Sequence, residues 1–292
     1  MNPYFAIDPV KHKTGVTQQE RLNHSKKCSK LLQTIFGKTQ QEIFEASKSY
    51  INRHKDLLSF FFALSFWQGV TQNELSEKAR TIPLLASIIT SEAISPRSAG
   101  KFSPGKIKGQ SIKRYRNSKP ARFTRFMIEC LSETDKRLLL KGYQFAKPGI
   151  FPLERRTTRH LVYNSLIRKN RHYAEKYCFS NINGTGASCC CINYIDSINI
   201  ASLNKFLIKL SKNFYQMRCS IVHDAYPVGF CHLDTRPQDV ASWGMTLVDT
   251  YQITGQGGSS LLVQYESEFH RDQLQKMFID AYWNAFKKGW PI

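Results

Sequence analysis

The sequence predicts a mainly α-helical protein with one β-hairpin before its last helix. Three observations lead to this fold class. Apolar residues recur at spacings of three and four in several segments, which is the period of an amphipathic helix. Residues that commonly cap helices precede several of these segments. Apolar and polar residues alternate on either side of Gly255-Gln-Gly-Gly258, where a turn between two strands is expected.

Residues 1–95 form the predicted N-terminal helical region. Within it, residues 17–54 are polar and helix-favouring, with apolar positions at helical spacing. Gly37 is expected to divide them into two helices, because glycine interrupts a helix at low cost. Residues 57–67 are strongly apolar, which predicts a buried helix.

A further helix is predicted at the end of this region, running toward Ile94. The pattern Thr71-Gln-Asn-Glu74 has the spacing of a capping box, in which the first and last residues bond each other's backbone. We therefore expect the helix to begin there. Pro83 is expected to kink or divide it, since proline lacks the amide hydrogen that the helix needs.

Residues 96–121 form a predicted basic, flexible loop or linker between domains. They are rich in Ser, Gly, Lys and Arg and contain three prolines. Ten basic and no acidic residues occur near this stretch, which places half of the net charge of +20 in about one tenth of the chain. The basic residues are Arg97, Lys101, Lys106, Lys108, Lys113, Arg114, Arg116, Lys119, Arg122 and Arg125.

The charge balance favours a polyanionic partner. The chain has 42 Lys and Arg against 22 Asp and Glu, and a field of that sign attracts nucleic acid first. Two clusters could contact RNA phosphates, the first with an aromatic ring for base stacking and the second at the start of a predicted helix over 157–177. Their alternative interpretation is a solvated surface. They are Lys113, Arg114, Tyr115 and Arg116, and then Arg155, Arg156 and Arg159.

Residues 122–292 form the predicted C-terminal domain. Helical spacing resumes at its start, and Ser132 is expected to cap a second helix that runs toward Phe145. Residues 246–269 form the predicted hairpin. A last amphipathic helix is predicted over residues 270–288. Its apolar positions are Leu274, Met277, Phe278, Ala281, Tyr282, Ala285 and Phe286.

The clearest helix precedes the hairpin. Ser202 is placed to cap its start, and Pro227 ends it. Seven apolar residues follow each other at spacings of three and four, which predicts one buried stripe. They are Leu203, Phe206, Leu207, Leu210, Phe214, Met217 and Ile221.

Arg218 and His223 occupy the end of this helix, away from the apolar stripe. At about 100° per residue they flank the outer surface without sharing one narrow face. A single regular helix would not bring both side chains onto one phosphate. The spacing therefore indicates either a site shared by two copies packed through these surfaces, or a final turn that unwinds.

The segment Phe214-Tyr-Gln-Met-Arg218-Cys-Ser-Ile-Val-His223-Asp224 resembles the signature of HEPN domains. In that family an Arg and a His lie four to six residues apart near the end of a helix. The aromatic pair before the Arg and the Ile-Val before the His extend the resemblance. Family members commonly carry Asn, Asp or His directly after the Arg, where this chain has Cys219.

The resemblance implies a helical-bundle homodimer that cleaves RNA through 2′-hydroxyl attack, without metal or cofactor. Arg218 and His223 would be the catalytic pair, with Ser220 and Asp224 in support; an alternative for Asp224 is a turn former. Many such nucleases are toxins or antiviral (abortive infection) effectors, and some have an antitoxin or regulatory subunit. The alternative is a catalytically inactive module that binds RNA or a partner.

Cysteine usage and the start of the chain favour the cytoplasm. The eight cysteines show no disulfide framework, and the adjacent Cys189, Cys190 and Cys191 cannot readily surround one metal ion. The first residues lack a signal peptide. The longest apolar stretch, residues 57–70, is too short to cross a bilayer, so no membrane is expected.

Overall fold

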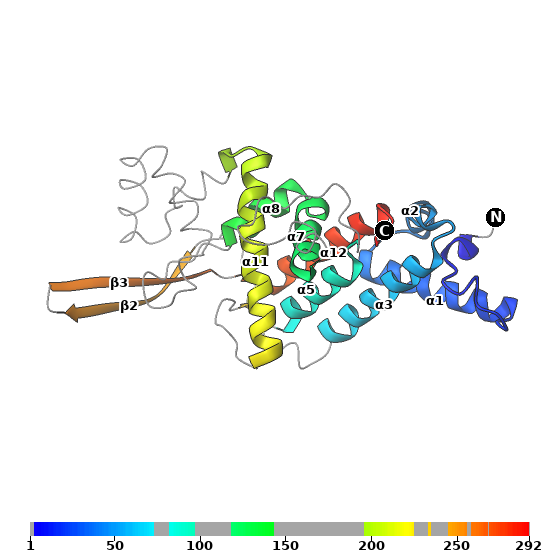
Figure 1. Cartoon of the computed structure of the whole chain (residues 1–292), viewed down its shortest axis with the longest axis horizontal. Coiled ribbons are helices and arrows are strands. Elements are labelled where there is room, and N and C mark those ends of the chain that lie inside the picture. Colours follow the sequence, from blue (N-terminus) through cyan, green and yellow to red (C-terminus); the bar gives the residue numbers. More distant parts are fainter. Residues whose placement is uncertain are drawn as a thin grey trace. The chain divides into compact units, whose positions relative to one another are not determined.

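The computed structural model describes residues 3–72, 82–96, 118–142, 196–224, 233–234, 245–255, 258–267 and 269–291. These residues are mainly helical, as predicted (Figure 1). Most of the predicted linker 96–121 and the whole predicted helix 157–177 lie outside them. The chain groups into two units, which are described separately. Unit 1 is Met1–Leu131 with Gln275–Ile292, and unit 2 is Ser132–Leu274.

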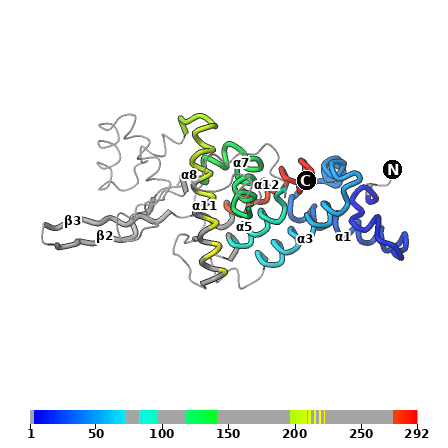
Figure 2. The backbone as a smooth tube through the Cα atoms, viewed as in Figure 1, coloured from blue at the N-terminus to red at the C-terminus, as the bar shows by residue number. Residues whose placement is uncertain are grey.

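Unit 1 is built from helices that come from both ends of the chain. Helices α3 and α5 lie side by side, as seen from the one direction that Figures 1 and 2 share. The first four residues of α12 belong to unit 2 and the rest to unit 1. The elements are η1 (Pro3–Ile7), α1 (Gln18–Phe36), α2 (Gln40–Ser47), η2 (Lys48–Tyr50), α3 (His54–Thr71), α5 (Ile82–Ile94), α7 (Lys119–Cys130) and α12 (Arg271–Lys287).

Capping boxes open α1 and α2. The hydroxyl of Thr17 accepts from the amide of Glu20 at 3.2 Å, and the Glu20 carboxylate accepts from the Thr17 amide at 2.8 Å. Thr39 and Glu42 repeat this exchange in α2. The bonds from the threonine amide and hydroxyl stabilise each carboxylate, which lowers the pKa of Glu20 and of Glu42. Gly37 ends α1 with a positive φ of 60°, so the predicted break is confirmed.

Helix α3 matches the predicted apolar helix but is buried on only part of its circumference. Phe60, Phe61 and Trp67 are buried, whereas Phe62 and Phe66 are 68% and 45% exposed. Phe62 and Phe66 are four residues apart and therefore share a face. A helix that is apolar around its whole circumference shows no pattern that marks its buried face. The sequence alone therefore could not identify this exposed face.

The predicted capping box at Thr71 is wrong for that residue. Thr71 is the last residue of α3, and its hydroxyl donates to the carbonyl of Trp67 at 2.8 Å. The rest of the motif, through Glu74, lies outside the described residues. Pro83 is the second residue of α5 and lies in its first turn, where the helix needs no amide hydrogen. The predicted kink is therefore absent from the described helix, Ile82–Ile94.

Helix α12 supplies the centre of the core of unit 1. Its seven predicted apolar positions are all buried, which confirms the amphipathic pattern. Phe286 packs on Tyr50 and Phe60 with ring centroids 5.1 and 5.2 Å apart. Tyr282 lies 5.5 Å from Phe126, and its hydroxyl donates to the carbonyl of Ser87 at 3.0 Å. Aromatic residues therefore join α12 to α3, α5 and α7.

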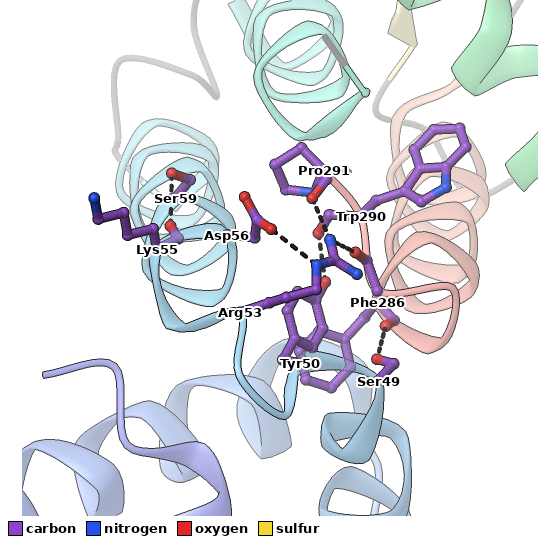
Figure 3. A network of polar contacts seen from close by, with 10 residues as sticks. Ser49, Tyr50, Arg53, Lys55, Asp56, Ser59, Phe286, Trp290 and Pro291 are labelled. Atoms are coloured by element: carbon purple, nitrogen blue, oxygen red, sulfur yellow. Dashed lines mark hydrogen bonds and ion pairs between the residues drawn. The ribbon is translucent and has the colours of Figure 1, made fainter. Parts of the chain in front are cut away.

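The residues after α12 are held by the segment that leads into α3 (Figure 3). Arg53 donates to the carbonyls of Gly289 at 2.6 Å and Pro291 at 2.5 Å, and its Nε bonds Asp56 at 3.0 Å. The hydroxyl of Tyr50 donates to the carbonyl of Trp290 at 2.5 Å. These bonds fix the course of the chain after α12.

The observed grouping differs from the predicted division at 96–121. Helices α7 and α12 were assigned by sequence to the C-terminal domain 122–292, yet both belong to unit 1 apart from the first residues of α12. Their aromatic side chains pack together, with Phe126 stacked 6.3 Å from Phe278. Composition identified a change in the chain but not which helices pack with which.

Unit 2 contains the helix of greatest interest, α11. Its elements are α8 (Glu133–Gly142), α11 (Ile200–Asp224), β1 (Leu233–Asp234), β2 (Met245–Gly255), β3 (Gly258–Ser267) and β4 (Phe269–His270). Strands β2 and β3 pair antiparallel and β1 and β4 pair parallel. The predicted cap of α8 is confirmed, because the Asp135 amide donates to the Ser132 hydroxyl at 3.0 Å. Helix α8 is described as far as Gly142, and the rest of the predicted helix, through Phe145, lies outside the described residues.

No helix within the described ranges combines the length and the apolar character needed to cross a bilayer.

Candidate functional site

The start of α11 is fixed by side chains of its own unit. Arg137 of α8 donates to the carbonyls of Asp196 and Ile198, each at 3.0 Å. The side chain of Asn199 accepts from the Ser202 amide at 2.9 Å and caps the helix. The predicted cap at Ser202 is therefore wrong. The helix begins at Ile200, so Ser202 lies within its first turn and supplies the amide instead.

One face of α11 is buried as the apolar pattern predicted. The exposed fraction is 1% or less for Leu203, Leu207, Leu210 and Phe214, and 8% for Phe206. The side chains of Met217 and Ile221 lie outside the described part. The buried stripe fixes the rotation of the helix about its axis, and it therefore determines which residues face outward.

A side of the last two turns that lies outside the buried stripe is exposed to solvent. Tyr215, Arg218 and Cys219 are partly exposed, and Val222 is 48% exposed. At about 100° per residue these four positions lie within a sector of roughly 100°. We call them the outer face of α11. Arg218 therefore lies on a surface that a ligand or a second protein could reach.

The guanidinium of Arg218 lies over an aromatic ring. Its Cζ atom is 5.6 Å from the ring centroid of Tyr215, one turn earlier in the same helix. The Nε atom of Arg218 is shielded from solvent. This is the distance of a cation–π contact, in which the ring attracts the cation and limits its orientation.

Arg218 and His223 lie on one regular helix. Helix α11 continues through Asp224, so its final turn does not unwind. The two positions are five residues apart in sequence, which corresponds to about 140° around the axis and about 7.5 Å along it. An unwound final turn, one of the two arrangements that the sequence allowed, therefore disagrees with this helix, and a site shared by two copies stays a prediction. The side chains of Ser220, His223 and Asp224 lie outside the described part.

The predicted RNA-binding residues cannot be placed relative to α11. They are Lys113, Arg114, Tyr115, Arg116, Arg155, Arg156 and Arg159, and all lie outside the described residues. Sequence analysis missed Tyr215 and Val222 as members of the outer face. The available signal was the three-residue spacing from Tyr215 to Arg218, which brings an aromatic ring and a cation together on a helix.

A second group of titratable side chains lies in unit 1. His54 is 7% exposed, its ring centroid is 4.9 Å from that of His12, and Asp8 is buried. Burial, followed by Lys11 and His12, lowers the pKa of His54. Burial and then Asp8 raise the pKa of the nearby Cys28 to about 12, so this thiol stays protonated and is a poor nucleophile.

Metal-binding geometry is missing from the part of the chain that the structure describes, where no three His, Cys, Asp or Glu side chains form a group able to hold an ion. Comparison with family models, with curated proteins and with solved structures finds no match for this chain.

Proposed function

We propose that the protein is a metal-independent endoribonuclease of the HEPN type, with Arg218 and His223 as its catalytic pair. The observation that carries the proposal is the outer face of α11. Arg218 is partly exposed there, on a regular helix that continues past His223. The resemblance of residues 214–224 to the HEPN signature and the net charge of +20 support the same conclusion.

In the proposed reaction, His223 of one copy removes the proton from the ribose 2′-hydroxyl. The 2′-oxygen attacks the phosphorus, and the bond to the 5′-oxygen breaks. The leaving 5′-oxygen takes a proton from His223 of the second copy, or more slowly from water where that His223 is missing. Arg218 stabilises the charge that builds on the phosphate oxygens. The products carry a 2′,3′-cyclic phosphate and a 5′-hydroxyl, and DNA resists cleavage because it has no 2′-hydroxyl.

The wider assignment is part of the same proposal. Unit 2 corresponds to a HEPN-like domain with the hairpin 246–269 following its catalytic helix. The basic segments around Lys113 and Arg155 hold RNA through its phosphates. The protein acts in the cytoplasm as a toxin or antiviral effector, restrained by an antitoxin or regulatory subunit.

A catalytically inactive binding module is the second candidate. Its supporting observation is Val222, an apolar side chain that is 48% exposed between the directions of Arg218 and His223. An exposed valine suits a surface that docks on another protein. Cys219, which replaces the polar residue common in the family, favours the same interpretation.

Cleavage of RNA in the presence of EDTA distinguishes the two candidates. We expect the wild type to cleave, leaving cyclic-phosphate ends, and His223→Ala and Arg218→Ala to lose activity by about 100-fold or more. Lys205→Ala is the matched control, because Lys205 is an exposed cation on the same helix, far from the outer face. Salt-sensitive RNA binding without cleavage would favour the inactive module. Equal cleavage by all four proteins would contradict the assignment of the site.

A further inference from the structure

The aromatic pair Phe214-Tyr215 divides into two environments. Phe214 is 1% exposed and belongs to the buried face of α11. Tyr215 is partly exposed on the outer face, where its ring lies beside the Arg218 guanidinium. The hydrophobic stripe therefore accounts for Phe214 and leaves Tyr215 without a role in that stripe.

A long cationic side chain on a helix surface samples several rotamers. Ordering such a side chain costs conformational entropy, which weakens any contact that needs one fixed geometry. A ring against one face of a guanidinium limits this freedom without covering its edge, where the in-plane N–H groups lie. Those in-plane donors are the groups that contact a phosphate at two points.

We propose that Tyr215 is a positioning residue for Arg218. Its ring holds the guanidinium plane so that the N–H groups meet the charge that develops on the scissile phosphate. This inference rests on the proposed nuclease function. It gives Tyr215 a part in that function, in which Tyr215 acts through Arg218 and does not contact the reacting atoms. If the Arg218 guanidinium is already oriented before the reaction, its conformational entropy is not lost on reaching the transition state. The activation free energy is then lower and kcat is higher.

The test compares Tyr215→Leu with Tyr215→Phe in the RNA cleavage assay. Leu removes the aromatic ring, and we expect kcat to fall roughly 3- to 30-fold with KM changed less than twofold, as loss of one cation–π contact would give. Phe keeps the ring and should retain kcat within about twofold. In an Arg218→Ala background, Tyr215→Leu should cause no further loss, because a residue that acts through Arg218 has nothing left to position.

Three outcomes would overturn the inference while leaving the nuclease assignment intact. A kcat for Tyr215→Leu equal to that of the wild type is the first. The second is a rise in KM alone, which would indicate that the ring stacks on an RNA base. An undiminished effect in the Arg218→Ala background, with a lower melting temperature, is the third, since it would mark a purely structural role.

A measurement without substrate separates failure of the inference from failure of the proposed function. The ring current of Tyr215 should displace the Nε–Hε resonance of Arg218 in a proton–nitrogen NMR spectrum. We expect this resonance to move in Tyr215→Leu and to keep its position in Tyr215→Phe. An unchanged resonance in Tyr215→Leu would overturn the contact between the ring and the guanidinium. The resonance could instead differ between the wild type and Tyr215→Leu while the wild type never cleaves RNA. That result would overturn the catalytic role of the contact and the proposed function together.

Discussion

Arg53 connects segments of the chain that are 236 residues apart. It donates to two carbonyls of the segment after α12 and to the carboxylate of Asp56. Its guanidinium also lies 5.8 Å from the ring centroid of Tyr50, which bonds the neighbouring carbonyl of Trp290. One side chain therefore satisfies backbone acceptors that no regular element satisfies (Figure 3).

Replacement of Arg53 should destabilise unit 1. Arg53→Ala removes three hydrogen bonds that involve a charged group, and we expect the free energy of unfolding to fall by about 2–4 kcal/mol. Urea denaturation followed by circular dichroism measures this loss. Lys55→Ala is the control, since Lys55 is an exposed cation two residues later. An equal effect of both variants would mean that the bonds of Arg53 contribute little.

His54 makes the stability of unit 1 depend on pH. Burial lowers the pKa of this imidazole, as do Lys11 and His12, while Asp8 opposes them. The folded state therefore binds a proton less readily than the unfolded state. Above the unfolded-state pKa of about 6.5, the imidazole is neutral in both states and the protein has its full stability. As the pH falls from there toward the lower pKa of folded His54, the free energy of unfolding decreases.

Unfolding by urea at pH 7.5, 6.5 and 5.5 checks this effect. We expect the wild type to lose stability over that range and His54→Leu to lose less, because leucine has no proton to gain. His24→Leu is the matched control, since His24 is exposed on α1. If His54→Leu kept the full slope, other groups would be responsible for it.

Among whole elements, α1, α7, α8, α11 and α12 follow closely from local sequence. Threonine and serine caps, Gly37 and the three-to-four spacing of apolar residues are physical signals that act within a few residues. The same signals gave the buried face of α11 and the outward direction of Arg218. They missed Asn199 as the cap because two polar residues, Asn199 and Ser202, lie near the same helix start.

What local sequence could not predict is the choice of partners among helices. The contact of Phe286 with Tyr50 and Phe60 joins residues more than 200 positions apart, and each ring is apolar in any arrangement. The orientation of Arg218 over Tyr215 was hidden for a related reason. Spacing shows that two side chains are neighbours on a helix, whereas the direction of each depends on its rotamer.

At the scale of the whole molecule, the proposed site requires two copies of the chain. Arg218 and His223 point about 140° apart on one helix, so each copy should complete the other. Mixing Arg218→Ala with His223→Ala after joint refolding should recover cleavage well above that of either variant alone. A mixed dimer retains one Arg218 and one His223, which come from different copies.

The control for this mixture is Arg218→Ala refolded with the double variant Arg218→Ala/His223→Ala, whose dimers contain no Arg218. We expect no recovery there. Absence of recovery in the first mixture, with mixed dimers demonstrated by mass spectrometry, would contradict a site that takes Arg218 and His223 from different copies.

The core formed by α12 also sets the order of events during protein synthesis. Residues 1–131 leave the ribosome before residues 132–274, and all of these must follow before Phe278, Tyr282 and Phe286 emerge. At the usual speed of translation this delay is on the order of ten seconds. Throughout it, the aromatic surfaces of α3 and α7 that receive α12 stay open to water and to chaperones. Unit 1 is thus completed only after all of unit 2 has been synthesised.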